Sequence, residues 1–78
     1  MEMFEELESV VLTRDIPDSG LNEGDVGTVV HRYGNGEGYE VEFVAGEGRT
    51  VAVLTLNRAD LRPLEDREIL HVRKLASA

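Results

Sequence analysis

The residues in this chain that could do chemistry are mostly carboxylates. Glu40 and Glu42 alternate along one expected strand, which places them on the same strand face roughly 7 Å apart. That spacing suits the two carboxylic acids of an inverting glycosidase. A chain of 78 residues, however, has no room to build a cleft and a substrate platform around them. We therefore expect both glutamates to face solvent.

A second set of oxygen ligands lies between residues 15 and 25. These side chains could gather around a calcium ion, and they belong to Asp15, Asp18, Asn22, Glu23 and Asp25. Pro17 stands where a helix–loop–helix calcium loop needs a ligand, and no flanking helices are evident. The segment therefore predicts no metal site, and we expect no cofactor.

Glycine and histidine offer two more candidate sites. Gly34, Gly36 and Gly38 have a phosphate-loop spacing, but such loops lead into a helix, and a strand is expected here. The Asn-Gly pair in this run predicts a hairpin turn instead. His31 and His71 are the only histidines, and neither stands in a nucleophile motif. With no cysteine for thiol chemistry, we expect a non-catalytic protein.

The elements that must position these side chains are short β-strands. Apolar and β-branched residues predict four of them, within 8–13, 26–33, 39–44 and 49–56. Asn57 can cap one short 3-10 turn before a fifth strand at 61–64, where Pro63 suits a sheet edge. About five antiparallel strands of this length predict an all-β, small SH3-like barrel. An oligonucleotide-binding barrel is the alternative, but it needs a helix between its third and fourth strands.

We expect a single domain over residues 1–78, with the barrel at about 8–64 and a C-terminal extension at 65–78. Apolar and polar residues alternate in the extension as in a strand, whereas acids at its start and cations at its end suit a short helix. We favour the strand and keep the helix as the alternative. Its apolar residues need a covering surface, which is the barrel or a second copy that associates through Ile69, Leu70, Val72 and Leu75.

Charge is unevenly distributed along the chain. There are 16 acidic and 8 basic residues, and residues 1–25 hold eight of the acids with Arg14 as their only base. This acidic surface either keeps the protein in solution or binds a basic protein, and its candidate binding residues are Asp15, Asp18, Glu23 and Asp25. A net charge of −8 disfavours nucleic acid. Binding to phosphates would need a basic stripe made of Arg58, Arg62, Arg67, Arg73 and Lys74.

Several short sequence blocks occur together in a recognisable order. They are Asp15-Ile16-Pro17, Gly24 to Val30, Tyr39 to Phe43, Gly48-Arg49-Thr50 and Leu54-Thr55-Leu56. Together they resemble a bacterial family of small proteins catalogued as domain of unknown function 4926, over roughly residues 8–64. The resemblance implies an SH3-like barrel and a small accessory or antitoxin-like protein encoded beside its partner. The extension at 65–78 goes beyond the family's short form.

A shorter block, Glu23 to Val30, resembles the glycine-and-valine hairpin of the KOW motif in ribosomal and transcription proteins. KOW hairpins that hold RNA rely on cations, whereas Glu23 and Asp25 flank this one. We therefore expect a protein-interaction module for a basic partner. The alternatives are KOW-like nucleic-acid binding through the basic stripe and self-assembly through the extension.

The remaining observations concern location and ligand class. The chain has neither a signal-like start nor an apolar run long enough for a membrane span, so we expect a cytoplasmic protein that does not contact membranes. It has no tryptophan and only four aromatic residues of the Phe and Tyr types. That number is too small for the aromatic groove of a proline-binding SH3 domain or for a methyl-lysine cage.

Overall fold

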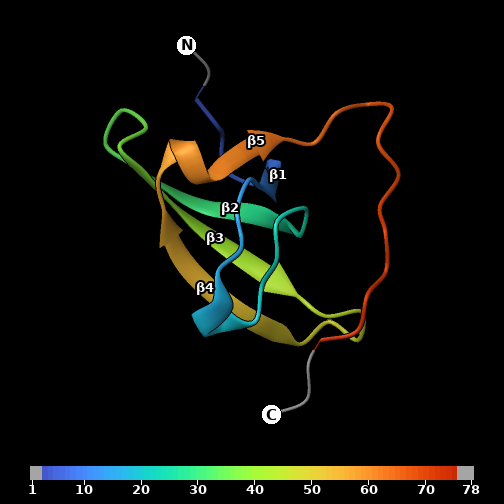
Figure 1. The fold of residues 1–78 in the computed structure, drawn as a ribbon. Helices are drawn as coiled ribbons and strands as arrows, with labels where there is room; N and C mark the ends of the chain where they lie inside the picture. Colours follow the sequence, from blue (N-terminus) through green and yellow to red (C-terminus); the bar gives the residue numbers. More distant parts are fainter. Residues whose placement is uncertain (1–2, 76–78) are drawn as a thin grey trace.

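The computed structural model describes residues 3–75 and shows one antiparallel β-sheet (Figure 1). Its strands are β1 (Ser9–Leu12), β2 (Val26–Tyr33), β3 (Gly38–Val44), β4 (Thr50–Leu56) and β5 (Leu61–Pro63), and its 3-10 turns are η1 (Pro17–Ser19) and η2 (Arg58–Asp60). The strand order is β4-β3-β2-β1-β5. This order, with η2 directly before β5, confirms the predicted all-β, SH3-like class. A tight turn joins β3 to β4 without a helix, which excludes the oligonucleotide-binding barrel.

The core lies on the concave face of the bent sheet. Along β3, Tyr39, Val41 and Phe43 are buried, whereas Glu40 and Glu42 lie on the outer face, as their alternation predicts. Phe4 is buried as well, and its ring meets the edge of Tyr39 with the ring centroids 5.3 Å apart. The Phe4 backbone N–H also donates to the Tyr39 hydroxyl at 3.2 Å. The core therefore includes the segment before β1.

Gly27 allows side chains of β3 to pack directly against the backbone of β2. A Cβ at this position would lie 2.7 Å from Val41 Cγ1 and 2.8 Å from Phe43 Cε2, closer than van der Waals contact permits. A register shift between Val29 and His31 then bends β2 further. The side chains of β3 thus occupy the space that a side chain at position 27 would need.

The loop between β1 and β2 is held by its own carboxylates. Asp15 Oδ1 accepts a hydrogen bond from the Glu23 N–H at 2.8 Å, and Asp25 Oδ2 accepts one from the Asn22 N–H at 2.8 Å. These are the local side-chain-to-backbone bonds that favour Asp in turns. Two of the four acidic residues of the candidate binding surface therefore fix the path of the loop.

The predicted cap at Asn57 is present. Its side-chain oxygen accepts from the Ala59 N–H at 3.0 Å, and Asp60 Oδ2 accepts from the Asn57 N–H at 3.1 Å, which together form a capping box around η2. Arg14 Nε donates to Asp60 Oδ1 at 2.7 Å. These contacts tie η2 to the end of β1 and set the direction in which β5 begins.

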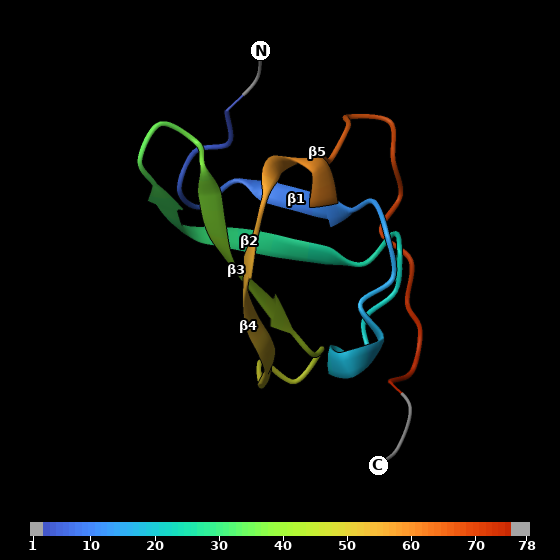
Figure 2. The same ribbon diagram turned by 60° about the vertical axis from the view of Figure 1, so that its left-hand side comes forward.

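The C-terminal extension differs from both predictions made for it. Over residues 65–75 it forms neither a strand nor a helix, and it makes one turn at 66–67 before running extended along the outside of the barrel, in orange to red (Figures 1 and 2). The eight described residues after the turn, 68–75, are too few for an isolated helix. Among the described residues this span pairs with no strand, and ion pairs at each end, described below, fix it to the barrel. Residues 76–78 lie outside the described part of the chain.

Across residues 3–75, no helix is long and apolar enough to span a membrane.

Candidate strap groove

The extension is fixed to the barrel at its beginning by Arg62 of β5. The Arg62 guanidinium donates to both carboxylate oxygens of Glu68, at 2.7 Å each. Glu68 Oε1 also accepts from the Glu65 N–H at 2.8 Å, which closes the turn at 66–67. Because the contact is bidentate and charge-assisted, it fixes the direction in which the extension leaves the barrel. We call residues 65–75 the strap.

The strap is fixed again near its other end by Arg73. The Arg73 guanidinium donates to both oxygens of Asp25, with Nε 2.9 Å from Oδ1, and to the Gly20 carbonyl at 3.0 Å. Arg73 therefore clasps the β1–β2 loop from outside. We refer to the Arg62–Glu68 and Arg73–Asp25 pairs as the two latches.

Both latches change the acidity of their carboxyl groups. Hydrogen bonds from Arg62, and then from the Glu65 backbone, lower the pKa of Glu68 from 4.5 to about 2. The pKa of Asp25 is also lowered, chiefly by its hydrogen bond with Arg73, against the opposing effect of partial burial. Both carboxylates are therefore ionised at neutral pH, so the latches are closed there.

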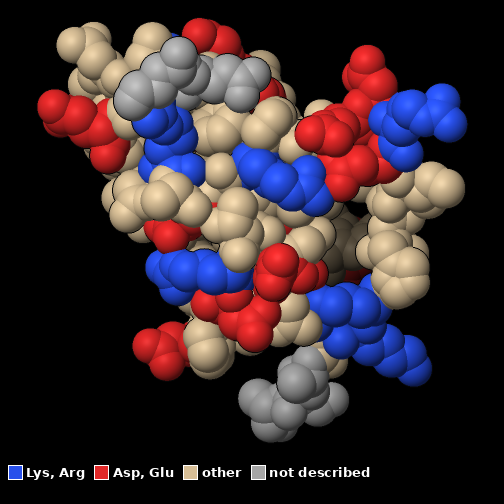
Figure 3. All heavy atoms as spheres, turned by 45° about the horizontal axis from the view of Figure 1, so that its top comes forward, with Lys and Arg blue, Asp and Glu red and all other residues tan. Residues whose placement is uncertain are grey.

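Between the latches the strap and the barrel enclose a groove of about 570 Å³. Its barrel wall is mostly apolar and includes Val11, Leu21, Val26, Phe43, Val44 and Val51. On the strap side it is lined by Ile69, Leu70, His71, Val72 and Leu75, and the latch residues lie at its ends. Figure 3 shows a hollow on the side of the molecule where the strap runs. An apolar pocket of this size with a few polar groups at its rim has the character of a binding site.

The strap also exposes apolar side chains to solvent. Ile69 is 92% exposed, Val72 is 91% exposed and Leu70 is 64% exposed. Val44 on the neighbouring end of β3 is half exposed. These residues form a cluster beside the groove, and such clusters mark interaction sites more often than single exposed aliphatic residues do.

The four acidic candidate residues are all in the β1–β2 loop, but they do different things. Asp15 and Asp25 are bound to the loop backbone, and Asp25 also forms a latch. Asp18 in η1 and Glu23 are exposed. Within residues 3–75, Asp18 and Glu23 are therefore the two of the four whose carboxylates make no hydrogen bond.

The five basic candidate residues are spread from η2 to the end of the strap. Arg58 lies in η2, Arg62 in β5, and Arg67, Arg73 and Lys74 in the strap. Arg62 and Arg73 hold the latches, so their guanidinium groups are already occupied by carboxylates. Acidic and basic side chains are interspersed on the face drawn in Figure 3.

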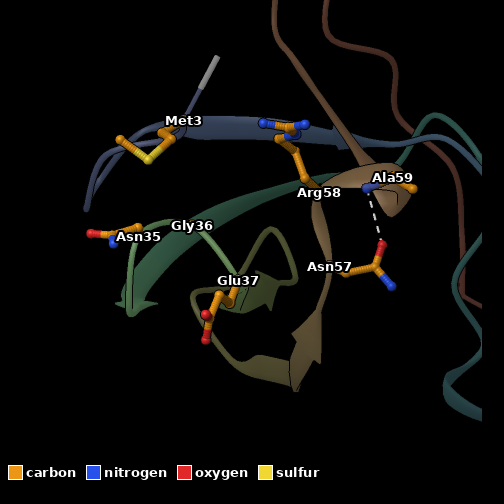
Figure 4. A pocket seen from close by; sticks show the side chains of 7 residues that line it. All are labelled: Met3, Asn35, Gly36, Glu37, Asn57, Arg58 and Ala59. Atoms are coloured by element: carbon orange, nitrogen blue, oxygen red, sulfur yellow. Dashed lines mark hydrogen bonds between the residues drawn. The ribbon is translucent and has the colours of Figure 1, made fainter. Parts of the chain in front are cut away.

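A second hollow, of about 610 Å³, lies between the β2–β3 hairpin and η2 (Figure 4). Met3, Gly36, Asn57 and Arg58 are among its lining residues. In Figure 4 the Asn57 side chain is directed to the Ala59 backbone, and Glu37 points away from Arg58. The hollow brings together no nucleophile and base, so the strap groove is the stronger candidate site.

The paired glutamates of β3 lie on the outer face of the sheet. Glu40 accepts a hydrogen bond from the Thr55 hydroxyl at 2.5 Å, and Glu42 accepts one from the Thr50 hydroxyl at 2.6 Å. These bonds link β3 to β4 across the strand pair.

No group of three or more potential metal ligands gathers within residues 3–75.

Sequence reasoning missed the groove and both latches. Asp25 and Arg73 are 48 residues apart, so no local pattern connects them. The one sequence feature that could have indicated a latch is the run of charges from Glu65 to Glu68, which directly precedes the apolar residues of the strap.

Comparison with known proteins supports the resemblance noted in the sequence. No curated protein and no solved structure shows a significant match to the chain. The model of the family described as Domain of unknown function (DUF4926) matches residues 6–63, which covers every strand of the described sheet and ends just before the strap. The chain therefore belongs to the family catalogued as domain of unknown function 4926.

Proposed function

We propose that this protein is a non-catalytic protein-interaction module that binds its partner at the strap and the groove beneath it. The observation that carries the proposal is the strap itself, a latched, extended segment with Ile69 and Val72 almost fully exposed beside an apolar groove. Covering these side chains would remove apolar surface from water, which is the main favourable term in protein association.

The charges around the site favour a basic partner. Glu23 and Asp18 are exposed on the β1–β2 loop next to the groove, and the whole chain carries −8. Complementary charge speeds encounter and selects among partners. An accessory or antitoxin-like role, with the partner encoded nearby, is the specific form of this proposal.

The latches argue against nucleic-acid binding through the basic stripe. Arg62 and Arg73 are each held by a carboxylate on both of its oxygens, so a phosphate would have to displace an existing charge-assisted contact. Protein binding needs no such exchange, because it uses the apolar part of the site.

The proposal is tested by capturing the tagged protein from a lysate of its native host, with and without nuclease. Washing at about 50 and about 200 mM salt separates the two classes of ligand, because phosphate contacts weaken steeply over this range. We expect one stoichiometric protein partner that resists nuclease and remains bound at the higher salt. Recovery of nucleic acid alone, or no bound protein, would contradict the proposal.

A further inference from the structure

The backbone of the strap is open to a further strand. Within residues 3–75, the N–H and C=O groups of residues 69–72 make no hydrogen bond. The segment is nevertheless held extended, because the latches fix it on both sides. An extended backbone with unpaired groups is the template on which peptides add as a β-strand, with alternate side chains entering pockets on one side.

The groove beside this backbone is electrically asymmetric. At its Arg62 end, Glu68 binds Arg62 directly, and Glu65 and Glu23 lie close enough to raise the pKa of Arg62 further. Glu65 also donates its backbone N–H to Glu68, so acidic groups outnumber basic ones around Arg62 at that end. At the other end Arg73 balances Asp25, and Lys74 follows. Between the latches the groove is lined by apolar side chains and by His71, with no Asp, Glu, Lys or Arg among its described lining residues there.

We infer that the groove takes an extended segment of another protein, apolar at alternate positions and with a lysine or arginine at the Arg62 end, which pairs with the backbone of residues 69–72. This inference rests on the proposed function and names the chemistry of the partner. The alternate apolar side chains would contact Val26 and Val44, and the cation would lie near Glu23 and Glu65. A second copy of this chain is a poorer occupant, because each copy carries a net charge of −8.

Three labelled peptides test the inference on the full chain. The first has two lysines followed by three valines that alternate with threonines, the second has glutamates in place of the lysines, and the third has prolines in place of the threonines. We expect the first to bind at least about tenfold more tightly than the second, as measured by fluorescence anisotropy. The third should bind at least about tenfold more weakly than the first, because proline cannot donate to a β-ladder. Amide exchange at residues 69–72 should slow when the first peptide binds.

A pair of matched variants tests the charge contribution. Glu23→Gln with Glu65→Gln should abolish the preference for the lysine peptide over the glutamate peptide. Glu6→Gln with Glu37→Gln makes the same change in net charge at exposed positions outside the groove lining, and it should keep that preference.

The inference is overturned if the lysine peptide does not bind, if it binds no better than the other two, or if its binding leaves exchange at 69–72 unchanged. It is also overturned if sedimentation shows that the protein alone dimerises and that the dimer excludes the peptide. If a partner is captured through the strap while the peptides fail, this inference falls and the proposed function stands. If the capture fails as well, both fall.

Discussion

At the scale of single residues, the fold depends on close packing at Gly27. Its missing side chain lets Val41 and Phe43 pack against β2, and a Cβ there would also come within 3.0 Å of the Glu42 carbonyl oxygen. Backbone cannot move aside as easily as the end of a flexible side chain. The close packing of β3 against β2 therefore leaves no room for a side chain at position 27.

We predict that Gly27→Ala destabilises the barrel by about 1–3 kcal/mol, the usual cost of overpacking a core. The free energy of unfolding in urea measures this effect. Gly46→Ala is the matched control, because a Cβ at Gly46 meets nothing within 4 Å. Equal stabilities of the two variants would show that β2 and β3 are not tightly packed at Gly27.

Glu68 allows a second prediction at the residue scale. Its pKa is about 2 with the latch closed and should return towards 4.5 when the strap is released. The closed state then binds fewer protons, so the latch stabilises the strap fully above pH 4.5 and loses this contribution as the pH falls through about 2. An NMR titration should find the Glu68 pKa near 2 in the wild type and closer to 4.5 in Arg62→Gln. The same pKa in both proteins would contradict the Arg62–Glu68 latch.

At the scale of elements, the strap holds its shape with few backbone hydrogen bonds. Its path is set by two ion pairs. Arg62 of the barrel binds Glu68 of the strap, and Arg73 of the strap binds Asp25 of the barrel. Segments with few buried contacts and few backbone hydrogen bonds open locally at low free-energy cost. The strap should therefore be able to loosen while the barrel remains folded.

We predict that Arg73→Gln lowers the backbone amide order parameters of residues 69–75 and leaves those of β2 and β3 unchanged, because it removes the contacts of the guanidinium with Asp25 and with the Gly20 carbonyl. NMR relaxation measures both regions. Lys74→Gln removes the same charge one residue later, where no side-chain bond is lost, and should leave the order parameters of the strap as in the wild type. Equal order parameters in the two variants would show that the latch does not hold the strap.

At the scale of the whole molecule, the barrel and the strap are separable. The family match ends at residue 63, the core contains no residue of the strap, and β5 is complete before the strap begins. A chain ending at residue 64 should therefore unfold cooperatively in a thermal scan monitored by circular dichroism. Loss of the cooperative transition would mean that the strap is part of the folding unit.

The sequence predicts the barrel well and the site poorly, for one physical reason. β2 was expected at 26–33 and is found at Val26–Tyr33, and Asn57 caps η2 as expected, because alternation and capping are local patterns. The strap was expected as a strand or a helix, since its alternation is equally local. The strap has no strand to pair with. Its path is set instead by contacts between Arg73 and residues about 50 positions earlier, and no local sequence pattern encodes such contacts.

The central claim is that a partner binds at the strap, and one comparison tests it most directly. Ile69→Asp with Val72→Asp places charge on the exposed apolar residues, and Leu7→Asp does the same to an apolar residue that is 79% exposed outside the groove lining. In parallel captures from the native lysate, we expect the partner to be lost from the strap variant and kept by the Leu7 variant. Equal recovery of the same partner on both variants would contradict the claim.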